Sequence, residues 1–128
     1  MFELTIKDTV YQFRFGLGFV REIDGTKQQK AENGVVQNVG LQYAVASVID
    51  EDPVALVDIL DIANKNEKPR VTKKLLDEYI EDESTDLEQL FKDLLDFFAN
   101  ANATKKKTAQ ILELVEKEKA KAAVKAAE

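Results

Sequence analysis

The sequence predicts a mostly α-helical protein of the α+β class, with a short β-hairpin at its N-terminus. Apolar and polar residues alternate only at the start of the chain, which is typical of half-buried strands. From residue 17 onward, apolar residues recur three and four positions apart, which is typical of helices packed on one side. We therefore expect a compact domain over residues 1–104, followed by an amphipathic, Lys/Ala-rich helical tail over residues 105–128.

The N-terminal hairpin is predicted from two short runs in which every second residue is apolar. The first run is FELTI, residues 2–6, and the second is YQFRF, residues 11–15. The polar residues KDT between them suit a tight turn. Because an isolated two-stranded hairpin is marginally stable in water, we expect helices to cover its apolar face.

After the hairpin, the sequence predicts a short helix and then a loop. The packed side of this helix should hold four apolar residues: Leu17, Phe19, Val20 and Ile23. Gly25 is a suitable residue to end the helix. Residues 26–38 are mostly polar and show no clear period, so we expect a loop there.

The middle of the chain predicts two consecutive helices. Residues 41–49 place their apolar side chains on one helical face. Asp52 is a preferred residue at the cap of a helix, and Pro53 is favoured at the first helical position, so a second helix should begin there. This second helix is apolar over more than half of its circumference, so we expect it to be the most central one.

Two more helices are predicted from residues that cap their first turns. Thr72 can cap one helix, and Thr85 with Glu88 matches the capping box of the next. That helix should end at the polar run NANAT, residues 100–104. These assignments complete the domain that precedes the tail.

The composition excludes most catalytic and metal-binding sites. The chain contains no histidine and no cysteine, so it lacks the commonest general base and the commonest ligands of transition metals. Its 24 acidic and 18 basic residues give a net charge of −6, which disfavours binding to nucleic acid or to anionic membranes. We expect no enzymatic activity, no cofactor and no metal, in a soluble intracellular protein.

A glycine pair follows the second predicted strand. Gly16 and Gly18 lie between a strand and a helix, where dinucleotide-binding loops occur, but the third glycine of that fingerprint is replaced by Arg21. The strand also belongs to a hairpin rather than to a βαβ unit. We interpret the glycines as a tight corner with close backbone packing.

Acidic residues are concentrated in one segment. Between Asp77 and Asp96 the chain holds nine acidic residues and one lysine. The pattern of an EF-hand calcium loop does not occur there, so we interpret these residues as a solvated acidic face. Such a face could instead imitate a nucleic acid, and this alternative function stays open at the level of the sequence, as does that of another helical protein-interaction module.

The tail differs from the rest of the chain in charge. From Lys105 onward, seven lysines and four glutamates give a net charge of +3, so the preceding residues carry −9 of the total of −6. Ile111, Leu114 and Val115 form a short apolar face on the predicted tail helix. These residues either close the core of the domain or bind a partner or a second copy of the chain.

Taken together, the pattern resembles the small tail assembly chaperones of long-tailed bacteriophages, in the branch common among phages of Gram-positive hosts. The resemblance is carried by FELTIKDTVYQFRFG with LGFVREID, by GLQYAVASVIDEDPVALVDILDIAN, and by KPRVTKKLLDEYIED followed by LEQLFKDLLDFF. It covers about residues 2–115 and depends on the order and spacing of these segments, none of which is a catalytic motif.

The resemblance implies a chaperone that binds the tape measure protein and keeps it soluble while tail tube subunits assemble around it. Such a protein acts in the host cytoplasm and is absent from the mature virion. The resemblance also implies a homo-oligomer of ring-like or spiral form. Many such proteins are made in a second, longer form by ribosomal frameshifting, and the extension recruits tail tube protein.

Overall fold

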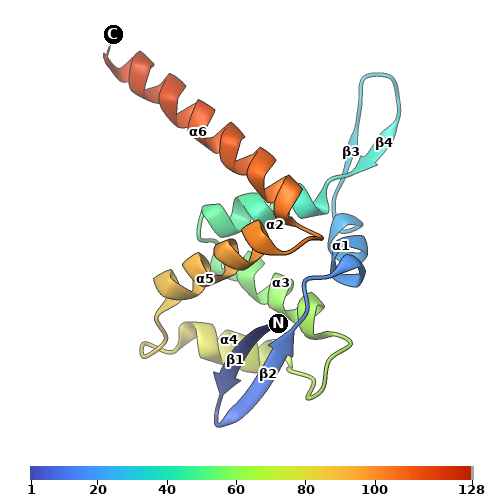
Figure 1. Cartoon of the computed structure of the whole chain (residues 1–128), viewed down its shortest axis with the longest axis vertical. Helices are drawn as coiled ribbons and strands as arrows, with labels where there is room; N and C mark the ends of the chain where they lie inside the picture. Colours follow the sequence, from blue (N-terminus) through green and yellow to red (C-terminus); the bar gives the residue numbers. More distant parts are fainter. Residues whose placement is uncertain (128) are drawn as a thin grey trace.

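The computed structural model describes residues 1–127 and the side chains up to residue 124. It confirms a mostly helical fold with a short N-terminal hairpin (Figure 1). The elements in chain order are β1 (Phe2–Ile6), β2 (Thr9–Phe13), α1 (Leu17–Asp24), β3 (Gln28–Lys30), β4 (Val36–Asn38), α2 (Gly40–Ile49), α3 (Pro53–Asn64), α4 (Lys73–Glu81), α5 (Leu87–Asn100) and α6 (Lys105–Ala127).

The predicted N-terminal hairpin is confirmed, but its second strand, Thr9–Phe13, begins and ends two residues before the predicted run over residues 11–15. The strands are antiparallel, with Phe2 opposite Phe13 and Ile6 opposite Thr9. The two turn residues, Lys7 and Asp8, have positive φ angles of 49° and 66°, which is the backbone of the turn that best matches strand twist. Phe2, Ile6 and Phe13 are buried, so the helices do cover the apolar face of the hairpin.

Aromatic side chains join the two ends of the domain. Phe15 contacts Phe19 of α1 at 4.9 Å and Phe98 of α5 at 5.0 Å between ring centroids, both edge to face. Phe2 and Phe97 complete this cluster, with centroids 5.8 Å apart. Edge-to-face pairs of this kind stabilise cores beyond the area that they bury. The cluster therefore fixes the hairpin and α1 against α5.

Helix α1 has the predicted bounds, but one of its predicted core residues is on the opposite side. Phe19 and Ile23 are buried, whereas Leu17 is 62% exposed, so the prediction for Leu17 was wrong. Residues two positions apart lie about 200° apart around a helix, so Leu17 and Phe19 cannot face the same neighbour. Packing against α2 and α5 selects the face of Phe19.

The predicted loop over residues 26–38 contains a second hairpin, β3–β4. Gln28 pairs with Asn38 and Lys30 with Val36, around a turn in which Gly34 has a φ of 84°. Every residue of both strands is exposed, so no alternation of apolar and polar residues could reveal them. The Asn-Gly pair in the turn was the available signal, since this pair favours hairpin turns.

The starts of α3 and α4 confirm the predicted caps. Asp52 Oδ1 accepts hydrogen bonds from the backbone N–H groups of Val54, at 3.0 Å, and Ala55, at 3.3 Å. Thr72 Oγ1 accepts one from Leu75 N at 3.1 Å. Helix α3 has a broad buried face, as expected of a central helix: Leu56, Val57, Ile59, Leu60, Ala63 and Asn64.

Helix α5 begins one residue later than the predicted capping box requires. Its cap is Asp86, whose Oδ1 accepts a hydrogen bond from Gln89 N at 3.1 Å. The Thr85 hydroxyl instead donates to the carbonyl oxygen of Tyr79 at 2.6 Å and closes the preceding turn. The predicted box was wrong because a contact with α4 engages Thr85, which leaves the cap to the next residue.

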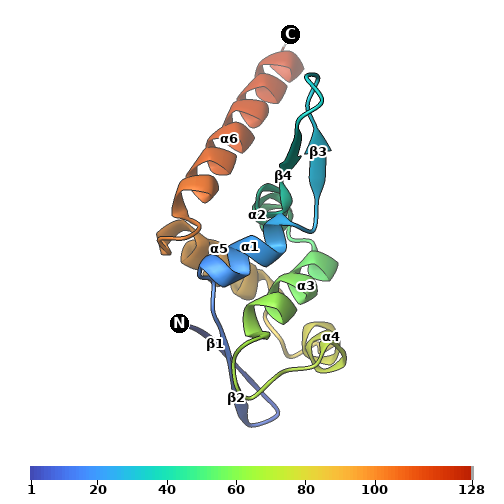
Figure 2. The same ribbon diagram turned by 90° about the vertical axis from the view of Figure 1, so that its right-hand side faces the viewer.

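Two elements extend beyond the rest of the molecule on the same side (Figures 1 and 2). We call β1, β2 and α1 to α5 the body, and we call α6 and the β3–β4 hairpin the arms. Both arms rise from the level of α2, at the opposite end from the β1–β2 hairpin. Among residues 1–127, no helix is long and apolar enough to cross a membrane.

Candidate functional site

The glycine corner between β2 and α1 lacks the features of a phosphate-binding loop. Gly16 caps α1 without a side-chain hydrogen bond and with negative φ. A side chain at Gly16 would meet no atom closer than 3.6 Å, and one at Gly18 would meet none within 4 Å. The expected close packing at these glycines was therefore wrong. Among the described residues, no cluster of three or more acidic side chains is arranged to hold a metal ion.

Close packing does occur at Gly40, the first residue of α2. A Cβ atom at this position would lie 1.7 Å from the carbonyl oxygen of Ile23, so only glycine fits. Asp24 Oδ1 accepts a hydrogen bond from Leu41 N at 3.2 Å at the same junction. The end of α1 and the start of α2 are thus held in direct backbone contact.

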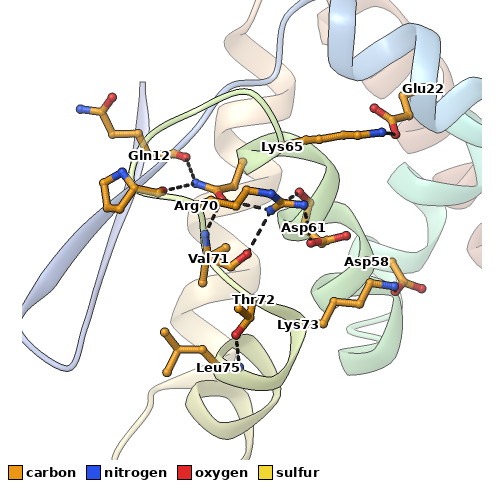
Figure 3. A network of polar contacts seen from close by, with 12 residues as sticks. Gln12, Glu22, Asp58, Asp61, Lys65, Arg70, Val71, Thr72, Lys73 and Leu75 are labelled. Atoms are coloured by element: carbon orange, nitrogen blue, oxygen red, sulfur yellow. Dashed lines mark hydrogen bonds and ion pairs between the residues drawn. The ribbon is translucent and has the colours of Figure 1, made fainter.

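A buried polar network fixes the loop between α3 and α4 (Figure 3). Asn64 is fully buried, and its amide nitrogen donates to the carbonyl oxygens of Gln12 at 2.9 Å and Pro69 at 3.1 Å. Its amide oxygen accepts from Val71 N at 2.7 Å and from Arg70 Nη1 at 3.1 Å. All four hydrogen-bonding positions of the Asn64 side chain are satisfied, so the network is structural.

Ion pairs around this network lie at the surface. Arg70 Nη2 lies 2.9 Å from Asp61 Oδ1, and Lys73 Nζ lies 3.1 Å from Asp58 Oδ1. The hydrogen bond and charge of Asp58 raise the pKa of Lys73 above its usual value. This shift keeps the lysine charged, which is the opposite of what a catalytic base requires. The pairs therefore connect α3 with α4 and the preceding loop without forming a catalytic arrangement.

The base of α6 is anchored in the body by two buried threonines. The Thr104 hydroxyl donates to the carbonyl oxygen of Phe98 at 2.8 Å, and the Thr108 hydroxyl lies 3.3 Å from the same oxygen and 2.8 Å from the carbonyl oxygen of Thr104. One turn further along, Ile111 packs against the core of the body. This first part of α6 is held by the body, and the later part extends beyond it (Figure 2).

An apolar groove lies where α6 diverges from α2. We call it the α2–α6 groove, and it is lined almost wholly by apolar atoms. Its lining residues are Ala46, Ile111, Leu114, Val115, Glu118, Lys119 and Ala122. The three residues predicted from the tail pattern are therefore brought together at one surface. Leu114 is 56% exposed, Val115 is partly buried, and Ile111 packs against the core, so the interpretation that this face closes the core applies to Ile111, whereas the Leu114 side chain remains exposed.

Four residues of the groove were not predicted from the sequence: Ala46, Glu118, Lys119 and Ala122. Ala46 lies outside the buried face of α2, and its small size leaves the floor of the groove open. Ala122 follows Ile111 by eleven positions and Val115 by seven, so it continues the same helical stripe. That spacing was the available signal for Ala122. Only the packing of α2 beside α6 reveals Ala46.

The model of a protein family described as phage tail assembly chaperone protein matches residues 3–113 of this chain. The chain belongs to this family. The predicted resemblance is thereby confirmed, and the protein is a phage tail assembly chaperone. Searches among curated proteins and among solved structures found no match.

The family match places the groove partly inside and partly after the matched region. Ala46 and Ile111 lie within it, whereas Leu114, Val115 and Ala122 follow its end at residue 113. The floor and the anchored base of the groove thus belong to the segment that defines the family. The outer wall is formed by the part of α6 beyond this segment.

Proposed function

We propose that this tail assembly chaperone binds the tape measure protein through the α2–α6 groove and keeps it soluble during tail assembly. The observation that supports this proposal is an apolar groove on a member of the tail assembly chaperone family. A long helical client exposes apolar faces before its partners cover them, and helix-in-groove binding shields such faces. In the host cytoplasm the chaperone would leave the client as tube subunits surround it, and it would be absent from the mature virion.

The proposal includes assembly of many copies along one client. The groove is lined by only seven residues and offers a modest apolar contact, so a single copy should bind weakly. Several copies that contact one another along the client would raise the overall affinity, because each further contact becomes intramolecular. The proposal therefore includes a homo-oligomer of the chaperone. It also includes the division of the chain into a domain over residues 1–104 and a helical tail over residues 105–128. Recruitment of tail tube protein by a longer, frameshifted form is a further part of it.

Co-expression with the tape measure protein of the same phage tests the proposal. We expect the tape measure protein to become soluble and to co-purify only when the chaperone is present. Leu114→Asp should abolish this effect without unfolding the chaperone, because the Leu114 side chain is more than half exposed at 56%. Val54→Asp is the matched control, since Val54 is 72% exposed on α3 and does not line the groove.

The salt dependence of the same complex separates this function from nucleic-acid mimicry. Apolar contacts are little affected by salt, whereas contacts between exposed charges are screened. We expect co-purification to persist from low to physiological ionic strength. A steep loss over this range, or equal loss with Leu114→Asp and Val54→Asp, would contradict binding through the groove.

A further inference from the structure

The outer part of α6, residues 116–124, forms a wall of the α2–α6 groove although the body does not hold it. Every side chain in this range is exposed, and the helix extends here beyond the rest of the molecule (Figure 2). Earlier in the helix, Ile111 packs against the core, and the hydroxyls of Thr104 and Thr108 are hydrogen-bonded to carbonyl oxygens. The helix therefore changes from an anchored segment to an uncovered one within the length of the groove.

The groove depends on the helical conformation of this outer part. Three of the residues that line it belong there: Glu118, Lys119 and Ala122. They lie on the same side as Ile111 and Val115 because residues three, four and seven positions apart share one face of a helix. If the outer part unwinds, this face is lost and only the anchored half of the wall remains. The complete groove thus requires a helical outer part.

Interactions within the outer part favour the helix only slightly. Residues 116–124 consist of Glu, Lys, Ala and one Val, and the first three are strong helix formers. The ion pairs of Lys117 with Glu113, at 3.3 Å, and of Lys121 with Glu118, at 4.0 Å, are exposed and add little. In proteins, most helical stability comes from the packing of an apolar face, which the body does not provide here. We therefore expect the helical and unwound forms to be close in free energy.

We propose that the outer part of α6 interconverts between helix and unwound chain, and that a client bound in the groove stabilises the helix. The client covers the apolar atoms of the groove and so supplies the packing that the body does not provide. This inference rests on the proposed function, because the client would be a segment of the tape measure protein. Binding and helix formation are then linked, since the measured affinity falls with the fraction of molecules whose outer α6 is helical.

Amide hydrogen exchange tests this linkage on the full chain, alone and co-purified with the tape measure protein. In the free chain, we expect residues 116–124 to exchange within about tenfold of the rate of an unstructured peptide, because their opening costs little free energy. In the complex, exchange over the same residues should slow by at least about tenfold, since the client stabilises the helix. Residues 108–112, in the anchored part of α6, should exchange slowly in both samples.

A glycine substitution separates helix formation from direct contact with the client. Ala120 is exposed and does not line the groove, so Ala120→Gly weakens the outer helix without removing a side chain of the groove. We expect this variant to keep up to about fivefold less tape measure protein soluble. Ala109→Gly is the matched control, because it makes the same change at an exposed position outside the groove, in the anchored part of α6. It should leave the amount of soluble tape measure protein unchanged.

Three results would overturn the linkage while the proposed function stands. The first is slow exchange of residues 116–124 in the free chain, which would show that the wall is already rigid. The second is co-purification of the tape measure protein without slower exchange over these residues. The third is an equal effect of Ala120→Gly and Ala109→Gly on its solubility. Failure of the wild-type chain to co-purify the tape measure protein would instead remove the proposed client, and the linkage with it.

Discussion

The body and the arms of this chaperone use their apolar residues differently. In the body, most large apolar side chains of the helices and of the β1–β2 hairpin form one core, with exposed exceptions such as Leu17 and Val54, and Asn64 and Gly40 hold the connections between elements. In the arms, Val35, Val36 and Leu114 are more than half exposed. The difference indicates that the core of the protein lies mainly in the body, whereas these apolar side chains of the arms stay exposed to solvent. Substitutions in the body should therefore lower stability, and those in the arms should alter binding or local order.

The largest loss of stability is expected for Asn64→Ala. The substitution leaves the carbonyl oxygens of Gln12 and Pro69 and the N–H of Val71 without their present partner, and it opens a cavity at a fully buried position. We expect the free energy of unfolding to fall by about 3 kcal/mol, measured by chemical denaturation. Asn66→Ala, at an exposed position of the same loop, should change it by less than about 0.5 kcal/mol. Equal effects of the two would show that the network does not hold the loop.

A somewhat smaller loss is expected for Gly40→Ala. The new Cβ would lie 1.7 Å from the Ile23 carbonyl oxygen, so α1 and α2 must separate. We expect a loss of about 2 kcal/mol in thermal or chemical unfolding, as for overpacked cores. Gly18→Ala is the matched control, because nothing lies within 4 Å of its Cβ and alanine favours the helix, so stability should rise by about 0.5 kcal/mol. A neutral Gly40→Ala would contradict the direct contact of the two helices.

An intermediate effect is expected where the α6 arm joins the body. Thr104→Val removes the hydroxyl that donates to Phe98 O at 2.8 Å, at a fully buried position. We expect a loss of about 1 kcal/mol and faster amide hydrogen exchange in the first turns of α6. Thr5→Val, on the exposed side of β1, should affect neither measurement. Faster amide exchange throughout the body would instead show that Thr104 stabilises the whole core and not only the junction with α6.

The smallest effect on global stability is expected in the β3–β4 arm. Gly34→Ala places a side chain at a φ of 84°, which costs about 1 kcal/mol for the turn itself. Because every residue of the two strands is exposed, the melting temperature should stay nearly unchanged, while exchange over residues 28–38 becomes about fivefold faster. Gly25→Ala, where φ is −72°, should leave this exchange unaltered. A clear fall in melting temperature would show that the arm supports the body.

The sequence by itself determined the elements that depend on neighbouring residues. The alternation in residues 2–15 specifies the β1–β2 hairpin, because each strand shows one apolar face to the core. Asp52 and Thr72 specify helix starts, because each side chain bonds to N–H groups two or three residues away. The order of such segments was also sufficient to predict the family.

The tertiary structure alone decided which of several locally allowed arrangements is used. A carbonyl oxygen of α4 engages Thr85 and leaves Asp86 as the cap of α5, and packing selects Phe19 over Leu17. Asn64 becomes a structural centre because Gln12, far away in sequence, lies beside it. The α2–α6 groove arises in the same way, since Ala46 meets the stripe of α6 only because α2 packs beside α6. Contacts between distant residues follow from the packing of whole elements, and no local pattern of side chains encodes them.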